Sequence, residues 1–201
     1  MQITAPLYNQ SRQPTGYLGK IAGRLMTPKN RQLIDWTVEQ LNIKPYQHIL
    51  EIGYGPGHTL QEVGRKLQIG FLAGIDHSVS MYQQAYQRNK RLVTQQLLQL
   101  HIGTVRELPY PSHYFHTIYG SNVHIFWKEP KYEFMQLASL LKTDGKLIML
   151  FQPRWASSEE EVQLAAQKIR EDYLEAGLVN VQIEFNDIYP VTCLSATAYK
   201  P

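Results

Sequence analysis

Cysteine is almost absent from this sequence, since Cys193 is the only one among 201 residues. A disulfide within the chain is therefore excluded, which fits a reducing compartment. Cys193 stands in the apolar run 191–198, where we expect a buried structural thiol rather than a nucleophile.

Long apolar stretches are missing as well. The longest runs, such as 147–151, fall far short of the about 20 residues that a membrane-spanning helix needs. The first ten residues, MQITAPLYNQ, lack the basic start and the apolar stretch of a signal peptide. We therefore expect a soluble, cytoplasmic protein without a membrane partner.

Charge of one sign is not concentrated, because 20 Lys and Arg face 17 Asp and Glu, for a net charge of +3. The tightest basic group is Arg88, Lys90 and Arg91, which is typical of a solvated helix end. A nucleic-acid partner is therefore not expected. His113 and His116 are three residues apart, but nothing completes a coordination set, so we also expect no metal.

The length favours one domain, at about 150 residues per domain. A hydrophobic content of 43% with 18% charged residues is typical of a globular chain with a large core. We expect residues 1–29 to form an N-terminal lid or helical segment and residues 30–201 to form a single domain.

Short apolar runs alternate with segments of helical period. The runs that predict strands are 48–52, 71–75, 97–102, 115–119, 146–151, 179–185 and 191–199. The segments that predict helices are 18–25, 28–41, 59–67, 78–86, a helix from Pro130 that ends just before Gly145, and 158–176.

Strands joined by helices pair in parallel through right-handed crossovers, whereas the last two runs lack a helix-length connection and must be antiparallel. The expected fold is α/β and Rossmann-like: a doubly wound, mainly parallel seven-stranded sheet with an antiparallel last strand and helices on both faces. Ligands of such sheets bind at the carboxyl ends of the central strands.

One of these ends carries a glycine loop. The segment Glu-Ile-Gly-Tyr-Gly-Pro-Gly at 51–57 follows a buried run, so Gly53, Gly55 and Gly57 permit a sharp turn and close approach of a ligand to the main chain. Asp76 ends the next strand, 25 residues after Glu51, where a carboxylate can accept hydrogen bonds from both ribose hydroxyls. An adenosine-containing cofactor is the natural inference.

Four segments resemble successive motifs of the class I methyltransferases, which use S-adenosylmethionine. They are ILEIGYGPG at 49–57, GIDHS at 74–78, GTVRELPYPSHYFHTIYGSN at 103–122 and LKTDGKLIML at 141–150. A dinucleotide-binding loop would more often run Gly-x-Gly-x-x-Gly, whereas His58 stands three residues after Gly55. The resemblance therefore implies a methyl transferase with S-adenosylmethionine as cofactor.

The resemblance also implies contacts to that cofactor. Glu51, Gly53, Tyr54, Gly55 and Gly57 would surround its methionine end, Asp76 its ribose, His77, Met81, Gly103, Thr104 and Val105 its adenine, and Ser121 or Asn122 its sulfonium. Two positions depart from the family pattern. Thr104 stands where an Asp for the adenine amine is common, and His116 replaces an Asp at the start of the fourth strand.

A sulfonium methyl group is already electrophilic, so transfer needs an in-line acceptor and exclusion of water, and a general base is optional. His124 and Tyr119 are the nearest candidate bases, with packing as the alternative for His124. Tyr17, Trp127 and Arg154 are candidate contacts to the acceptor. We expect a small-molecule acceptor, and a monomer or homodimer.

Other functions stay open at this point. The chain is alternatively a non-catalytic cofactor-binding module or partner subunit, and RNA or protein acceptors are not excluded. An NAD-dependent oxidoreductase is a further alternative. Its Tyr-x-x-x-Lys spacing occurs at Tyr86 and Lys90, but on a segment remote from the expected site.

Overall fold

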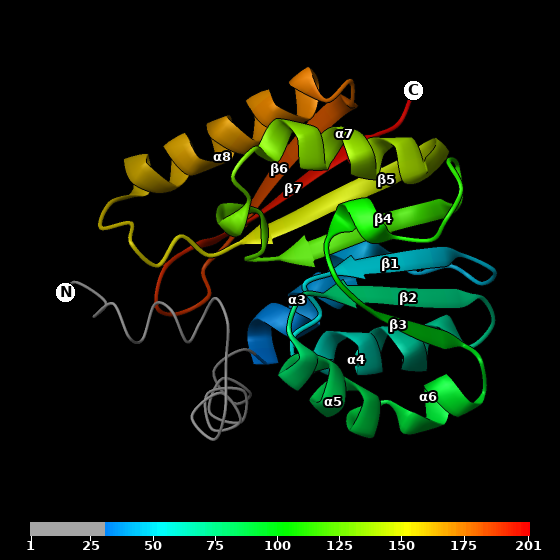
Figure 1. Ribbon diagram of the computed structural model, residues 1–201. Coiled ribbons are helices and arrows are strands. Elements are labelled where there is room, and N and C mark those ends of the chain that lie inside the picture. Colours follow the sequence, from blue (N-terminus) through cyan, green and yellow to red (C-terminus); the bar gives the residue numbers. More distant parts are fainter. Residues whose placement is uncertain (1–30) are drawn as a thin grey trace.

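The computed structural model describes residues 31–201 (Figure 1). The expected lid at 1–29 and the expected helix at 18–25 lie outside these residues. The strands are β1 His48–Ile52, β2 Phe71–Asp76, β3 Leu98–Ile102, β4 Phe115–Ser121, β5 Leu141–Phe151, β6 Val179–Asn186 and β7 Cys193–Tyr199. The helices are α3 Arg31–Leu41, α4 His58–Leu67, α5 Val79–Arg88, α6 Lys90–Thr94, α7 Pro130–Leu140 and α8 Glu159–Glu175, with the short 3-10 turns η1 Val105–Glu107 and η2 His124–Phe126.

The described strands form one seven-stranded sheet in the order β3-β2-β1-β4-β5-β7-β6. The pairs from β3 to β5 are parallel, and β7 is antiparallel to both β5 and β6. The predicted doubly wound sheet with an antiparallel last strand is confirmed. All central parallel strands therefore end at one edge of the sheet.

Helices cover both faces of the sheet (Figure 1). The helices α3, α4 and α5 pack on one face, and α7 and α8 pack on the other. Neighbouring strand residues alternate between the two faces, since Ile49 faces the first group and Leu50 faces the second. Both are fully buried, because helices cover both faces of a parallel sheet.

Local signals place several helix starts correctly. The hydroxyl of Ser78 accepts a hydrogen bond from the Met81 N–H at the start of α5, and that of Ser158 accepts from the Glu161 N–H at the start of α8. Pro130 occupies the first turn of α7. These caps fix where each helix leaves the sheet edge.

The expected helix end before Gly145 is wrong, because β5 begins directly after α7. Leu141 pairs with Phe115 of β4, and the register then shifts between Phe115 and Thr117. Gly145 lies in this irregular part of β5, where a Cβ would come within 2.7 Å of the Lys142 carbonyl oxygen. The glycine therefore serves a bulge in a strand and not a helix end.

Candidate functional site

The glycine loop lies where β1 ends, between the ends of β2 and β4. Its first amide, on Gly53, donates to the Ile75 carbonyl at 2.8 Å. The glycine at 55 has φ +50, and a Cβ built there would meet no atom within 4 Å. At Gly57 a Cβ would come within 2.8 Å of the Ala85 Cβ on α5. Close packing thus accounts for Gly57, whereas the space beside Gly55 is open for a ligand.

The predicted loop and the predicted acid are in direct contact. Asp76 is 8% exposed, and its Oδ2 accepts a hydrogen bond from the Gly55 N–H at 2.8 Å. Its Oδ1 accepts from the Ser78 N–H at 2.9 Å. A carboxylate has about four lone-pair sites, so these two bonds orient Asp76 and leave acceptor capacity toward a ligand.

Glu51 lies beneath this loop and is almost fully buried. Its Oε2 accepts a hydrogen bond from the Tyr119 hydroxyl at 2.7 Å. Burial, with a smaller contribution from the charge of Asp76, raises the pKa of Glu51 to about 8, although the Tyr119 bond opposes this shift. Tyr119, a candidate base, is fully buried with its hydroxyl on Glu51, and burial raises the pKa of that hydroxyl too.

Tyr54 reaches away from the loop toward β3. Its hydroxyl donates to the His101 carbonyl at 3.0 Å, and its ring packs over Gly74 of β2. A Cβ on Gly74 would come within 2.8 Å of that ring. Tyr54 therefore forms part of the floor between the ends of β1, β2 and β3.

The residues predicted around adenine gather at the ends of β2 and β3. The Gly103 N–H donates to the Asp76 carbonyl at 3.0 Å. The His77 side chain is 47% exposed, with Nδ1 3.8 Å from Asp76 Oδ1. Met81 is buried against the α3–α5 side of the core, and Val105 is buried on the other side. These positions therefore lie near the same edge of the sheet, but Met81 and Val105 lie on its two opposite faces.

Thr104 does not stand alone at this edge. Its N–H and its hydroxyl both donate to Oε2 of Glu107, at 2.7 and 2.8 Å. These bonds lower the pKa of Glu107. Position 104 therefore lacks an acid of its own, but Glu107 brings a carboxylate to it from three residues later. The sequence pattern did not single out Glu107.

The end of β4 is tied to the end of β5. The Asn122 N–H donates to the Leu150 carbonyl at 2.9 Å, and its Oδ1 accepts from the Gln152 N–H at 2.8 Å. Its Nδ2 lies 3.4 Å from the Ser121 hydroxyl. Ser121 and Asn122, predicted near the sulfonium, are both half-buried at this edge.

Gln152 is a buried residue whose structural role sequence reasoning did not assign. Its Nε2 donates to the carbonyls of Ile188 and Val191 at 2.7 and 2.9 Å, in the loop between β6 and β7. Its Oε1 accepts from Arg154 Nε at 3.1 Å. One amide thus holds the β6–β7 loop and a guanidinium beside the β5 end. A lone Gln after a strand carries no motif, so no sequence signal marks it.

The remaining candidates have distinct surroundings. His124 is buried, its ring lies edge-on to Phe151 at 4.7 Å, and its Nδ1 makes no hydrogen bond within residues 31–201. Burial lowers the pKa of His124 to about 4. Trp127 packs edge-on against Phe134 of α7. Tyr17 lies outside the described residues.

Two residues lie outside any candidate role. His116 sits at the start of β4, the opposite edge from the glycine loop, where its Nδ1 accepts the His48 N–H at 2.9 Å. Cys193 is fully buried, and burial raises the pKa of its thiol to about 12. The thiol is therefore structural, as the apolar run around it predicts.

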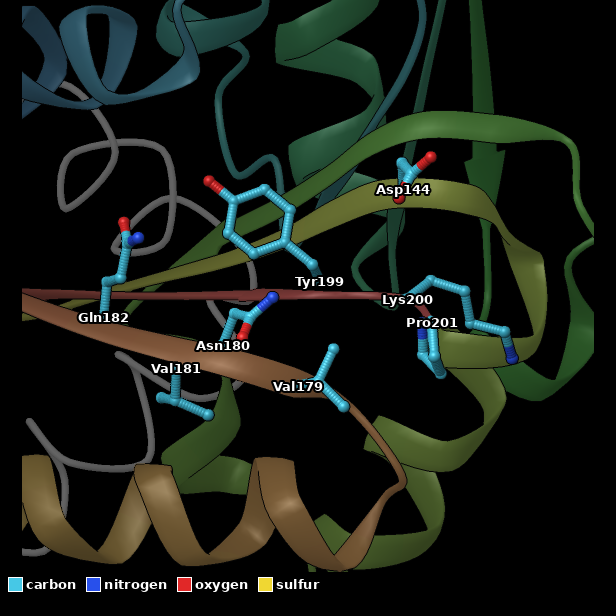
Figure 2. A pocket seen from close by; sticks show the side chains of 8 residues that line it. All are labelled: Asp144, Val179, Asn180, Val181, Gln182, Tyr199, Lys200 and Pro201. Carbon is cyan, nitrogen blue, oxygen red and sulfur yellow. The ribbon is translucent and has the colours of Figure 1, made fainter.

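A hollow at the far end of the sheet is separate from this site (Figure 2). It is lined by Asp144, Val179, Asn180, Val181, Gln182, Tyr199, Lys200 and Pro201. These residues lie near the start of β5 and β6 and the end of β7, whereas the glycine loop and Asp76 lie at the ends of their strands. Within 31–201, no cluster of three or more metal-ligating side chains occurs, and no helix is long and apolar enough to cross a bilayer.

A mainly parallel sheet of this order with an antiparallel β7, a glycine loop after β1 and an acid at the end of β2 defines the class I methyltransferase fold. The family profile described as methyltransferase domain matches residues 49–145. Uncharacterized methyltransferase YdaC of Bacillus subtilis is 31% identical over 182 residues, which cover 90% of this chain and 98% of that protein. The chain therefore belongs to the methyltransferase family, and S-adenosylmethionine is the methyl donor of its class.

Solved structures agree on the fold. A chain from the Haloferax volcanii complex between the Trm112 methyltransferase activator and a methyltransferase has a TM-score of 0.73 at 15% identity, covering 90% of this chain and 93% of that one. Geranyl diphosphate C-methyltransferase from Streptomyces coelicolor A3(2), in complex with S-adenosyl-L-homocysteine, has a TM-score of 0.65 at 13% identity, covering 85% and 76%. The predicted methyltransferase class is thus confirmed, rather than the oxidoreductase alternative.

Proposed function

We propose that this methyltransferase transfers the methyl group of S-adenosylmethionine to a small-molecule acceptor by in-line displacement. The observation that carries the proposal is the contact between the Gly55 N–H and Asp76, which joins an open main-chain turn to a buried carboxylate. The near balance of 20 basic and 17 acidic residues, which are spread along the sequence, favours a small-molecule acceptor over a nucleic acid.

The residues at the edge fit the cofactor. Asp76 would accept the ribose hydroxyls, since its two backbone bonds hold the carboxylate in one orientation. The main chain at Gly53, Gly55 and Gly57 would border the methionine end, because a side chain at position 55 would fill the open space there. When bound, the sulfonium supplies an electrophilic methyl group that needs no further activation.

Glu51 would face the ammonium group at the methionine end. A buried carboxyl gains most from an adjacent cation, because water screens the pair poorly there. Tyr119 is then a positioning residue, whose hydroxyl holds Oε2 of Glu51 at 2.7 Å. Its place beneath the loop favours this role over that of a base for the acceptor.

The acceptor would enter beside the ends of β4 and β5. Ser121 and Asn122 border that position, and His124 follows them in η2. His124 is neutral at pH 7, since burial holds its pKa near 4, so its role here is a hydrogen bond to the acceptor or packing against Phe151. A strong general base is not required for this reaction.

Arg154 would recognise an acidic group of the acceptor. Its guanidinium is oriented by the bond from Nε to the buried Gln152 amide, and guanidinium groups bind carboxylates and phosphates through paired N–H donors. Tyr17 and Trp127 remain predicted acceptor contacts. The Streptomyces neighbour acts on geranyl diphosphate, an acceptor with such an acidic group.

The test is binding of S-adenosylhomocysteine, measured by calorimetry. We expect roughly micromolar affinity for the wild type and a loss of at least about tenfold in Asp76→Asn, because charge-assisted hydrogen bonds to the ribose are lost. Asp144→Asn, at the far end of the sheet, is the matched control and should bind as the wild type does. Absence of binding to the wild type would contradict the proposal.

Turnover of S-adenosylmethionine labelled in its methyl group, in a metabolite extract, tests the acceptor class. Label in a small-molecule product supports the proposal, and label only in RNA or protein contradicts it. The second candidate function is a methyltransferase that is active only with a protein activator, since the Haloferax neighbour is bound to one. Methyl transfer by the purified chain alone excludes that requirement. The cytoplasmic location and a monomeric or homodimeric state remain predictions.

A further inference from the structure

Two consecutive side chains at the end of α5 hold the far end of the glycine loop. The Nε–H of Arg88 donates to the Pro56 carbonyl at 2.8 Å, and Nδ2 of Asn89 donates to the Gly57 carbonyl at 2.9 Å. Arg88 is exposed, whereas Asn89 is 2% exposed. The basic group that contains Arg88 predicts a solvated helix end. Both side chains instead bond to the loop after β1, 32 positions earlier in the chain.

The backbone of the loop constrains itself poorly. Gly55 and Gly57 have φ values of +50 and +76, and glycine loses more conformational freedom on ordering than any other residue. Pro56 lies between them and has no N–H to donate. Within residues 31–201, its carbonyl accepts one hydrogen bond, the one from Arg88. Bonds from α5 therefore supply a constraint that the loop sequence itself lacks.

The Asn89 amide lies directly against the loop. A Cβ on Gly57 would come within 2.6 Å of its Nδ2. The Gly57 carbonyl already accepts the Gln61 N–H at 3.2 Å, so the Asn89 bond is not needed to satisfy that carbonyl. The Asn89 Oδ1 is buried without a partner in residues 31–201, which is unfavourable. An amide retained at this cost favours a role in orienting the loop.

Holding the two carbonyls fixes two successive peptide groups. Because a peptide group is planar, the Pro56 carbonyl sets the direction of the Gly57 N–H, which donates to the Tyr54 carbonyl at 3.0 Å. The Gly57 carbonyl sets the direction of the His58 N–H at the start of α4 in the same way. The turn at Gly55, directly before Pro56, is thereby fixed on its C-terminal side.

We propose that Arg88 and Asn89 are positioning residues, which hold the glycine loop in the conformation that binds S-adenosylmethionine. The inference rests on the proposed binding of that cofactor. Neither side chain needs to contact the ligand. They raise the fraction of molecules in which the turn is open and the Gly55 N–H bonds to Asp76. The apparent affinity for a ligand falls in proportion to that fraction, so loss of either bond should weaken binding.

The test uses two uncharged side chains at position 88. Gln places an amide donor as many bonds from the main chain as Arg places its Nε, whereas Met places a sulfur there that donates nothing. Calorimetry with S-adenosylhomocysteine should show about three- to tenfold weaker binding in Arg88→Met, as expected for one lost hydrogen bond. Arg88→Gln should bind within about twofold of the wild type, because it restores the donor.

Arg170→Met is the matched control. Arg170 on α8 is also exposed, and its Nη1 donates to a main-chain carbonyl, that of Val181, at 3.1 Å. Arg170→Met and Arg88→Met should lower the thermal midpoint by similar small amounts, but Arg170→Met should bind the ligand as the wild type does. Asn89→Leu, which removes the donor and the unpartnered oxygen together, should weaken binding as Arg88→Met does.

A second ligand separates positioning from direct contact. In 5′-methylthioadenosine the amino acid part of the cofactor is missing. Arg88→Met should weaken the binding of both ligands by the same factor, because the held turn also bonds to Asp76 at the expected ribose position. Weakening of S-adenosylhomocysteine alone would indicate a charge contact to its carboxylate and overturn the inference.

Three other results also overturn the inference. They are equal affinity in wild type and Arg88→Met, equal losses of affinity in Arg88→Met and Arg170→Met, and an Arg88→Gln variant as weak as Arg88→Met. In each case the wild type still binds S-adenosylhomocysteine, so the proposed function stands. Failure of the wild type to bind it overturns the proposed function as well.

Discussion

Replacing Glu51 by Gln should stabilise the ligand-free protein at high pH. The folded state holds the Glu51 proton up to a pKa of about 8, whereas the ordinary value for the unfolded chain is 4.5. Between these values the folded state binds more protons, so the free energy of unfolding falls as pH rises, by about 1.4 kcal/mol per pH unit. The loss is complete above about pH 8 and amounts to at most about 5 kcal/mol. Gln does not ionise and retains an oxygen for Tyr119.

The assay is urea unfolding of wild type and Glu51→Gln without ligand, at about pH 5, 7 and 8.5. The stability difference in favour of Gln should be near zero at the lowest pH and reach several kcal/mol at the highest. Tyr119→Phe is the companion variant. It removes the hydrogen bond that opposes the rise in the Glu51 pKa, so the loss of unfolding free energy in this variant should extend to higher pH than in the wild type. A difference between Glu51→Gln and wild type that does not change with pH would refute a raised Glu51 pKa.

Three further outcomes are expected. Gly55→Ala should cost only about 1 kcal/mol for its positive φ yet abolish S-adenosylhomocysteine binding in calorimetry, whereas Gly57→Ala, whose Cβ would lie within 2.6 Å of the Asn89 side chain and 2.8 Å of the Ala85 Cβ on α5, should lower the thermal midpoint markedly. Because the folded pKa of His124 is lowered to about 4, the contribution of His124 to stability should fall as pH drops from about 6.5 toward 4, opposite in sign to that of Glu51, so the stability of His124→Gln relative to wild type should rise over that window in urea titrations. Gln152→Leu should cost about 2–4 kcal/mol of unfolding free energy, because two loop carbonyls lose their donor.

The order of strands and helices was predictable because each burial pattern is local. The runs at 48–52 and 71–76 are buried on both faces, and the caps at Ser78 and Ser158 depend on residues three positions away. The bulge at Gly145 was not predictable, since it depends on pairing with β4, about 30 residues earlier in the chain.

The candidate site divides in the same way. The glycine loop and Asp76 were visible as a motif, and their 2.8 Å contact follows from adjacent parallel strands. The roles of Gln152 and Tyr119 depend on partners 36 and 68 positions away, and no spacing in the sequence encodes such partners. Glu107 was within reach of sequence reasoning, because a Thr followed by Glu three residues later is a capping pattern.

The most direct test of the account is a crystal structure of the protein with S-adenosylhomocysteine. The account predicts that both ribose hydroxyls lie within hydrogen-bond distance of Asp76 and that the main chain at Gly55 contacts the ligand. A ligand bound elsewhere, such as in the hollow beside Asp144, or an Asp76 carboxylate that contacts only the Gly55 and Ser78 N–H groups, would contradict it.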